Sequence, residues 1–348
     1  MRVYVYPADI HGCGYYRLIW VARALATQGH HITIVMPGDP RFPAIQGKVY
    51  NGRTVAASAP ADADVMVMQR VTHRRLAEAI PIFRKRGIAV VMDMDDDLTC
   101  IHPSNPAWHA LHPSADGAFG WDVAQDSCRD ATLVTVSTDA LADRYAPHGR
   151  VVVLRNCVPE WYLDVEHRDS AVVGWGGALA SHPDDLTVLG PAMARHTATG
   201  GRFHVVGPPH GVQEFLGIET NWSASGGVHL TQWPHQLAHD IGIGIAPLAD
   251  TRFNAAKSWL KPMEYAALGI PWIASPRAEY ARLHEEGAGV LAKRPRDWER
   301  LCRDLAADPV RRQEMSEAGR IVAARHTIEM NAWRWWDAWD EALRIQRA

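Results

Sequence analysis

Short apolar runs alternate with helical patterns along most of this chain. The first run spans Arg2–Tyr6, and Leu18, Val21 and Leu25 then recur at helical spacing until Gly29 ends the stripe. Runs that are apolar throughout, rather than alternately apolar and polar, are typical of strands buried on both faces. When helices separate such strands, the strands pair in parallel and the helices cover the sheet. The sequence therefore predicts a doubly wound α/β architecture.

The runs form two series on either side of a mostly polar stretch, Arg155–Ser170. We expect strands at residues 2–6, 32–36, 64–68, 88–92, 133–136 and 151–154, and then at 171–175, 203–206, 228–230, 241–246, 272–274 and 290–291. A length of 348 residues also suggests about two domains. We predict two Rossmann-like domains, at residues 1–158 and 159–326, with a cleft between them, and a C-terminal helix at 327–348 that packs back toward the first. Ligands bind such sheets at the carboxyl ends of the strands.

Composition limits the class of partner. With 36 basic and 39 acidic residues, the net charge of −3 provides no global field to hold nucleic acid. The five cysteines are odd in number and lack CxxC spacing, which favours a reducing cytoplasm over a disulfide framework or a zinc site. No run of about 18 apolar residues is present to span a membrane. Four of the 14 tryptophans lie within residues 333–339 of the last helix, where we predict that they have a structural role and lock the two domains together.

The segment Phe253–Pro271 is the most informative part of the chain. Gly269 is a good helix stop, and the proline after Ile270 prevents the helix from resuming. Because Pro262 is tolerated only near a first turn, we expect the regular helix to start near Leu260.

Two lysines, Lys257 and Lys261, then lie near a helix N-terminus, where the macrodipole favours anions. A bound diphosphate, held by free N–H groups, Ser258 and the lysines, would compensate the unfavourable placement of two positive charges at this helix end. If the preceding turn is helical, Glu264 shares their face and is placed to accept hydrogen bonds from sugar hydroxyls. The alternative is an exposed face with a Lys261–Glu264 ion pair.

The same segment resembles the donor-binding region of GT-B glycosyltransferases, specifically the retaining family 4-like group. Glu264, followed by a Gly-Ile-Pro exit from the helix, matches the glutamate that the family uses to hold the ribose of a nucleotide sugar. The family's earlier glutamate, eight positions before, is Ala256 here, and its usual Gly-Phe-Gly is Lys-Ser-Trp at residues 257–259. The chain thus resembles a divergent branch of the group.

The resemblance covers nearly the whole chain and implies further donor-binding residues. Gly176 and Gly177 correspond to a loop that approaches the donor phosphates, and Trp233 lies where the family places its nucleobase pocket. A basic pair that the family carries after the glycine loop is absent, and we expect Lys257 and Lys261 to substitute for it. Asn254, Lys257, Ser258, Lys261 and Glu264 complete the predicted donor site.

Carboxylates are concentrated in the run Asp93–Asp97, which follows a buried strand of the first half. Four carboxylates in five positions repel one another and need compensation. In one interpretation Asp95 or Asp96 orients or deprotonates an acceptor hydroxyl. In another the run holds a divalent cation such as Mg²⁺, although GT-B enzymes as a class need no metal for their chemistry. A solvated acidic turn is the third interpretation.

Four other residues of the first half are predicted to bind the acceptor. Gly14 lets the backbone approach a ligand closely, with an ordinary tight turn as the alternative. Arg17 is placed to meet a phosphate or an acceptor, and Arg70 ends a strand toward the cleft. His102 lies in a region where family members often carry a histidine near the reacting sugar.

These residues and the resemblance together predict a glycosyltransferase. It would move a sugar from a nucleotide-diphosphate sugar to a hydroxyl acceptor, with retention of configuration by resemblance, and Lys257 would stabilise the leaving diphosphate. No cofactor or metal is expected beyond the co-substrate, and the acceptor and oligomeric state stay open. The alternatives are an inactive GT-B-like binding protein, a transferase acting on a hydroxylated nucleic-acid base, and a sugar-nucleotide epimerase.

Overall fold

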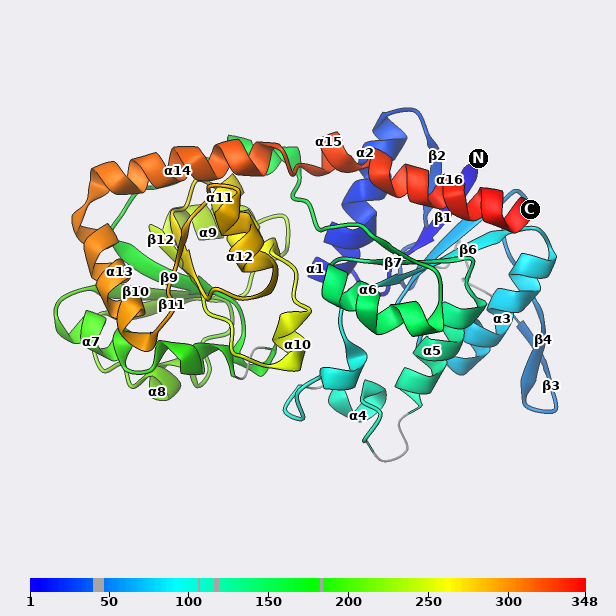
Figure 1. Ribbon diagram of the computed structural model, residues 1–348, viewed down its shortest axis with the longest axis horizontal. Coiled ribbons are helices and arrows are strands. Elements are labelled where there is room, and N and C mark those ends of the chain that lie inside the picture. The colour runs from blue at the N-terminus through cyan, green and yellow to red at the C-terminus, as the bar shows by residue number, and fades with distance from the viewer. Residues whose placement is uncertain (40–46, 106, 116–118, 182–183) are drawn as a thin grey trace. The chain divides into compact units, whose positions relative to one another are not determined.

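The computed structural model divides the chain into two compact units (Figure 1). It describes residues 1–39, 47–105, 107–115, 119–181 and 184–348. Unit 1 comprises Met1–Asn156 together with Ile328–Ala348, and unit 2 comprises Cys157–Thr327. The chain therefore passes from one unit to the other twice.

Unit 1 is built on a six-stranded sheet in which every pairing is parallel. Its order is β2 (His31–Ile34), β1 (Arg2–Tyr6), β5 (Val65–Gln69), β6 (Ala89–Met94), β7 (Leu133–Val136) and β8 (Val151–Val153). The central strands β5 and β6 are buried along their whole length, as their apolar runs predict. The strand order reverses between β1 and β5, so their carboxyl ends define the switch point of this sheet.

Helices accompany the strands of unit 1. They are α1 (Gly12–Gly14), α2 (Trp20–Thr27), α3 (Arg74–Lys85), α4 (Trp108–Leu111), α5 (Gly120–Asp130), α6 (Asp139–Tyr145), α15 (Ile328–Asn331) and α16 (Trp333–Arg347). A π-helical turn, Tyr15–Ile19, joins α1 to α2. A separate antiparallel hairpin, β3 (Gly47–Tyr50) and β4 (Arg53–Ala57), contacts α3.

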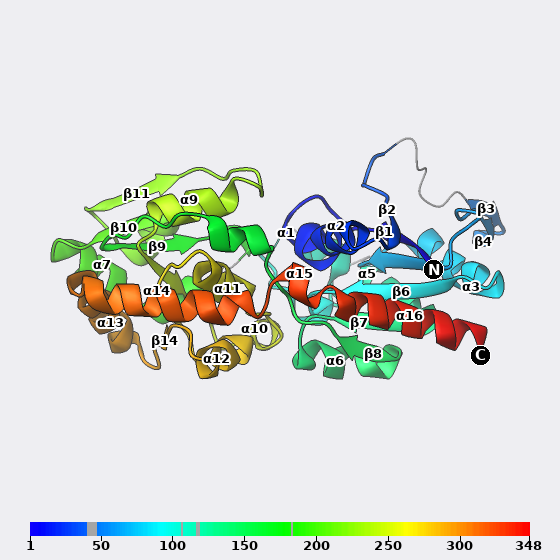
Figure 2. The ribbon, with the colours of Figure 1, turned by 90° about the horizontal axis from the view of Figure 1, so that it is seen from above.

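The last helix, α16, packs on β5, β6 and β7 (Figure 2). Trp335 and Trp339 are 1% and 0% exposed, so they form part of the unit 1 core. Trp336 stacks on His30 with 3.7 Å between ring centroids, whereas Trp333 is exposed. Three of the four tryptophans thus pack within unit 1, and the prediction that they lock the two domains together stays a prediction.

Unit 2 is built on a second parallel sheet, in the order 3-2-1-4-5-6 that dinucleotide-binding folds share. The order is β11 (Trp222–Ser225), β10 (Arg202–Val206), β9 (Val172–Gly176), β12 (Ile243–Ala246), β13 (Trp272–Ala274) and β14 (Val290–Leu291). Its helices are α7 (Ala192–Ala198), α8 (Val212–Leu216), α9 (Trp233–Asp240), α10 (Arg252–Ala255), α11 (Leu260–Ala267), α12 (Ala278–Glu285), α13 (Pro295–Ala307) and α14 (Pro309–Ala324). The switch point lies between β9 and β12.

The predicted fold class, two Rossmann-like domains with parallel sheets, is confirmed. One strand was predicted wrongly, because β11 occupies residues 222–225 rather than 228–230. Its sequence, Trp-Ser-Ala-Ser, lacks an apolar run because β11 lies at the sheet edge and is largely exposed. In the described part of the chain, no helix is both long and apolar enough to cross a membrane.

Candidate functional site

Arg17 and Asp93 form a buried ion pair at the centre of unit 1. Their side chains are 1% and 0% exposed, with Arg17 Nη2 at 2.7 Å from Asp93 Oδ1 and Arg17 Nε at 3.2 Å from Asp93 Oδ2. Arg17 also donates to Asn156 Oδ1 at 2.9 Å and to the Leu154 carbonyl, and Thr135 donates to Asp93 at 2.7 Å. The prediction that Arg17 binds the acceptor is therefore corrected: its guanidinium ties the π-helical turn to the sheet.

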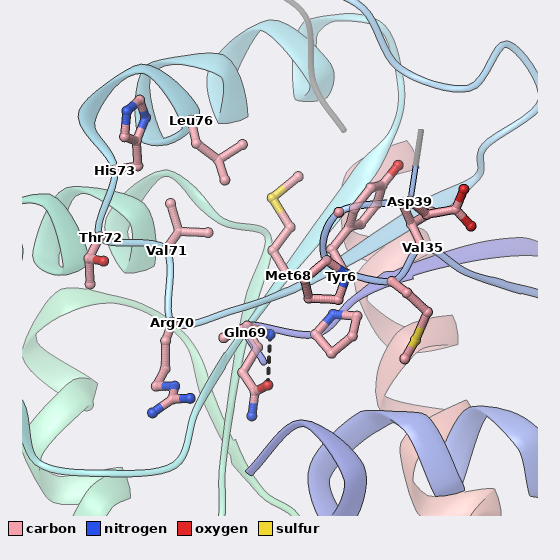
Figure 3. A pocket seen from close by; sticks show the side chains of 15 residues that line it. Tyr6, Val35, Asp39, Met68, Gln69, Arg70, Val71, Thr72, His73 and Leu76 are labelled. Atoms are coloured by element: carbon pink, nitrogen blue, oxygen red, sulfur yellow. Dashed lines mark hydrogen bonds between the residues drawn. The ribbon is translucent and has the colours of Figure 1, made fainter. Parts of the chain in front are cut away.

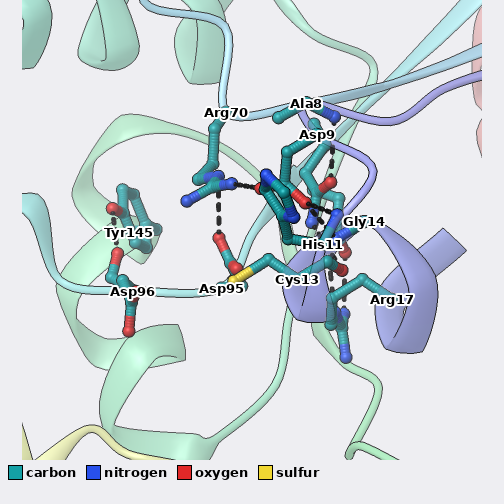
Figure 4. A network of polar contacts seen from close by, with 12 residues as sticks. Ala8, Asp9, His11, Cys13, Gly14, Arg17, Arg70, Asp95, Asp96 and Tyr145 are labelled. Carbon is teal, nitrogen blue, oxygen red and sulfur yellow. Dashed lines mark hydrogen bonds and ion pairs between the residues drawn. The ribbon is translucent and has the colours of Figure 1, made fainter. Parts of the chain in front are cut away.

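A second pairing surrounds Asp95, as Figure 4 shows. The guanidinium of Arg70 lies between two carboxylates: it pairs with Asp9, and its Nε lies 3.3 Å from Asp95 Oδ1. The Cys13 thiol donates a hydrogen bond to Asp95. Burial raises the pKa of the Asp95 carboxyl above its usual range, although Arg70 opposes the shift. A carboxyl with a raised pKa beside a fixed cation suits proton exchange with a hydroxyl.

The backbone of Arg70 is itself unusual. Its φ is +45°, in the left-handed region that costs a non-glycine residue free energy. The positive φ comes directly after β5, at the switch point of the sheet, and Arg70 N donates to the Asp93 carbonyl at 3.0 Å. The strained backbone of Arg70 thus orients its side chain so that the guanidinium reaches Asp9 and Asp95.

Asp97, at the end of the acidic run, is compensated within the protein. Asp97 caps the short helix Leu98–Cys100 by accepting from Thr99 N at 3.0 Å, and it pairs with Arg144 Nε at 3.0 Å. The Asp96 carbonyl accepts a hydrogen bond from Tyr145 at 2.8 Å. Asp93, Asp95 and Asp97 therefore each face a different arginine. Among the described residues, no group of three or more His, Cys, Asp or Glu side chains could hold a metal ion.

Gly14 makes a close backbone approach, but to the protein itself. A Cβ at this position would lie 2.0 Å from the Asp9 carbonyl oxygen, and Gly14 N donates to Asp9 Oδ1 at 3.0 Å. The tight turn, rather than a ligand, thus explains the glycine. His102 is exposed, and its Nδ1 contacts Ser104 Oγ at 2.7 Å in a local turn.

In unit 2, Tyr265 of α11 marks the switch point. Strands β9 and β12 pair over only two residues of each, and the Tyr265 hydroxyl lies between them. It accepts from Gly176 N at 3.1 Å and lies 3.4 Å from the Ile245 carbonyl, to which it donates. A Cβ at Gly244 would lie 2.7 Å from the Tyr265 ring, so this glycine makes room for it. The helix is thereby fixed against the ends of the two strands.

Lys261 lies one turn before Tyr265 and reaches the same strand end. Its ammonium donates to the Gly176 carbonyl and lies 5.1 Å from the centroid of the Trp175 ring. A Cβ at Gly177 would come within 3.1 Å of Lys261 Nζ, so the glycine loop and the lysine are directly adjacent. Burial lowers the pKa of Lys261 to about 8. A cation held in this way next to a glycine loop suits an anionic ligand.

The other predicted phosphate ligands lie in the loop before α11. The turn before α11, at residues 256–259, is not helical, so Lys257 does not share a helix face with Lys261 and Glu264. Its ammonium lies 4.2 Å from the centroid of the Phe253 ring. Because the charge of Lys257 contributes to lowering the pKa of Lys261, the two cations are near each other. Lys257 and Ser258 are both partly exposed.

Asn254 has a structural role that its sequence position did not predict. Its Nδ2 donates to Asp185 Oδ1 at 2.6 Å and to the Ala249 carbonyl at 3.1 Å, and the side chain is buried. Asp185 is 4% exposed and also accepts from Ala249 N at 3.1 Å. Asn254 thus holds the loop that carries Lys257 rather than facing a ligand.

Glu264 and Trp233 border the same strand ends. Glu264 is 7% exposed and lies on α11 one turn after Lys261. Its negative charge partly opposes the lowering of the Lys261 pKa by burial. Trp233 is the first residue of α9, and a Cβ at Gly176 would lie 3.0 Å from the Cζ2 atom of its ring. The structure therefore brings together Gly176, Gly177, Lys261, Glu264 and Trp233 at the carboxyl ends of β9 and β12. Asp185 and Tyr265 hold the site together, and neither was identified from the sequence. The one signal for Tyr265 was its position one turn after Lys261, and nothing in the sequence pointed to Asp185.

Two parallel sheets, each with a site at its strand ends, define the GT-B class of fold. The chain resembles sucrose-phosphate synthase from Thermosynechococcus elongatus, with a TM-score of 0.66, 13% identity, and 98% of each chain covered. For Anabaena HepE in complex with UDP, the TM-score is 0.62 with 13% identity, covering 98% of this chain and 100% of that one. For the catalytic domain of Arabidopsis thaliana starch synthase IV bound to ADP and acarbose, the TM-score is 0.63 with 9% identity, covering 98% of this chain and 99% of that one.

The family is indicated by the second half of the chain. Residues 188–337 match the model of the glycosyl transferase-like family, a stretch that includes α11 and most of unit 2. No curated protein matches the sequence. The prediction of a glycosyltransferase is thereby confirmed at the level of the fold and the family domain. Its assignment to the retaining family 4-like group stays a prediction.

Proposed function

We propose that this chain transfers a sugar from a nucleotide-diphosphate sugar to a hydroxyl acceptor, with retention of configuration. The observation that carries the proposal is the cluster at the switch point of unit 2, where Lys261 meets Gly176 and Gly177. A glycine loop gives a diphosphate close access to the backbone, and a lysine beside it supplies charge. The match of residues 188–337 to a glycosyltransferase-type family supports the same assignment.

Each donor contact has a distinct task in this proposal. Lys261, Lys257 and Ser258 hold the diphosphate and stabilise the negative charge that builds on it as the bond from the sugar C1 to the phosphate oxygen breaks. Glu264 accepts hydrogen bonds from the ribose hydroxyls, and Trp233 packs beside the nucleobase. The acceptor oxygen forms the new bond to C1 on the same face.

Unit 1 would bind the acceptor in this proposal. Asp95, with its raised pKa, and the neighbouring Asp96 are the groups that orient or deprotonate the acceptor hydroxyl, beside the fixed cation of Arg70. The proton that the hydroxyl loses passes to a carboxylate and finally leaves with the diphosphate. We expect no metal ion in this reaction, and the cytoplasmic location stays a prediction from the cysteines.

An inactive binding protein is the second candidate, because Ala256 stands where the resembling family has a glutamate that contacts the transferred sugar. A thermal-shift panel of UDP-, ADP-, GDP- and TDP-sugars identifies the donor, since saturation at 100 times Kd stabilises a protein by about 2.7 kcal/mol. Slow hydrolysis of that donor by the protein alone then distinguishes an enzyme from a binding protein.

Glu264→Gln tests the donor site directly. We expect at least about tenfold weaker nucleotide binding, because a neutral amide accepts hydrogen bonds less strongly than a carboxylate. Glu285→Gln, on the exposed face of α12, is the matched control and should bind normally. Unchanged binding by Glu264→Gln, or a panel without a stabilising nucleotide sugar, would remove the donor assignment.

A further inference from the structure

A pocket of about 480 Å³ opens at the carboxyl ends of β1, β2 and β5, within unit 1 (Figure 3). This volume lies in the usual range for small-molecule sites, roughly 300–1,000 Å³. The position is the switch point of the sheet, where α/β folds bind ligands. Of the site residues predicted from the sequence, Arg70 alone lines this pocket, at one edge.

The walls of the pocket are mainly apolar. Side chains from four segments of unit 1 supply them: Pro7 after β1, Val35 and Met36 after β2, Met68 of β5, and Val71 before and Leu76 within the first turn of α3. Such walls favour the flat or aliphatic body of a ligand, because burying its apolar surface stabilises the complex.

The strongest polar side chains at the pocket are already engaged by the protein. Gln69 accepts from Ala8 N at 3.0 Å and donates to the Cys13 carbonyl at 3.2 Å. The guanidinium of Arg70 points away from the labelled apolar side chains in Figure 3, toward its two carboxylates. A sugar ring, with a hydroxyl on nearly every carbon, would lose more hydrogen bonds to water here than the pocket replaces.

A few polar groups nevertheless remain at the pocket. The phenol of Tyr6, whose pKa is raised by burial, stays neutral and presents a hydroxyl, and His73 is exposed just before α3. Asp39 and Thr72 also line the pocket. A few polar groups on a mainly apolar surface fix the orientation of a ligand without demanding many hydroxyls.

We propose that this pocket binds the apolar body of a hydroxylated small molecule, a phenol or a hydroxylated ring system, as the acceptor. A saccharide chain is disfavoured as its occupant. The identity of the ligand as acceptor rests on the proposed function, whereas its chemical class rests on the pocket alone.

Calorimetric titration of the whole chain, without any nucleotide sugar, tests the proposal. The probes are 7-hydroxy-4-methylcoumarin, a flat hydroxylated ring system, and maltose, a saccharide. We expect saturable binding of the coumarin and none of maltose. Leu76→Trp and Met36→Trp, from two different walls of the pocket, should each weaken coumarin binding by at least about tenfold, because both residues are partly exposed and the added ring fills the cavity.

Ile82→Trp is the matched control, since Ile82 is partly exposed on the same helix, α3, and does not line the pocket. It should bind the coumarin like the unmodified chain. Absence of coumarin binding, equal binding by all variants, or pocket-dependent binding of maltose would each overturn the proposal. UDP and ADP titrated into the same preparations report on unit 2 separately, so failure of the donor assignment is distinguishable from failure of this inference.

Discussion

Replacing Lys261 with methionine should stabilise the free protein while weakening its binding of nucleotide. Methionine keeps the length of the buried stem but removes the ammonium that lies against Gly176 and Trp175. A residue whose purpose is structural would show the opposite pattern, since its loss would destabilise the fold and spare the ligand. The two measurements together therefore separate a ligand-binding role from a packing role.

The stability change follows from the pKa of Lys261, which burial lowers from 10.5 to about 8. At about 1.4 kcal/mol per pKa unit, the charged ammonium costs the fold about 3 kcal/mol at pH 7. This net cost already includes what the ammonium gains from the Gly176 carbonyl. Lys261→Met should thus raise the free energy of unfolding by up to about 3 kcal/mol, measured by urea denaturation.

The contribution of Lys261 to the free energy of unfolding changes with pH in a definite direction. Between pH 8 and 10.5 the unfolded chain binds more protons at Lys261 than the folded one, so this lysine makes stability rise with pH across that window. From pH 7 to pH 9.5 the contribution is about 2 kcal/mol, and it should be missing in Lys261→Met.

Nucleotide affinity should change in the other direction. Losing a charge-assisted hydrogen bond to a phosphate should weaken UDP or ADP binding by about 10- to 100-fold at pH 7. In the unmodified protein, affinity should fall about tenfold from pH 7 to pH 9, as the lysine loses its proton. Lys293→Met, an exposed lysine of the same unit, is the control. Equal affinity in Lys261→Met, or a flat profile between pH 7 and pH 9, would refute the reasoning.

Three further substitutions test the fold around the sites. Arg17→Met should cost about 3–5 kcal/mol in urea denaturation, because it leaves Asp93 buried and unpaired; a loss below 1 kcal/mol would contradict the pairing. Gly14→Ala should lower the Tm strongly, since its Cβ would meet a backbone oxygen, whereas Gly12→Ala, with no neighbour within 4 Å, should not; similar Tm values would count against the close approach. Tyr265→Phe should cost about 1–3 kcal/mol and weaken nucleotide binding, and a neutral result would exclude a bridging role for its hydroxyl.

Local signals in the sequence predicted most of the fold. The strands Arg2–Tyr6, Leu133–Val136 and Trp272–Ala274 are present as predicted, because each is an apolar run bounded by polar residues or turns. The helix α11 starts at Leu260, as Pro262 required, and Gly269 follows its end with a φ of +71°. Steric limits on proline and glycine are local, so a single sequence reveals them.

Pairings between distant residues could not be predicted in the same way. The acidic run was correctly expected to need compensation, but its partners are arginines, and Arg17 lies 76 residues before Asp93. Arg70 and Arg17 look equivalent in sequence, since each lies near the end of a strand or loop; only burial distinguishes the ion pair in the core from the one beside the pocket. The hairpin β3–β4 escaped prediction because nearly all of its residues are exposed and show no apolar periodicity.

The double passage of the chain between its units has a consequence for the order of folding during synthesis. Unit 2 is one continuous stretch, whereas unit 1 needs α16 from the last residues to cover β5, β6 and β7. At about 5–20 residues per second, the ribosome takes about 10 to 30 seconds to make residues 157–327 after the six strands of the first sheet have emerged. Throughout that interval, the surface that Trp335 and Trp339 later bury stays uncovered. The half of the protein that is made first is therefore the half that finishes folding last.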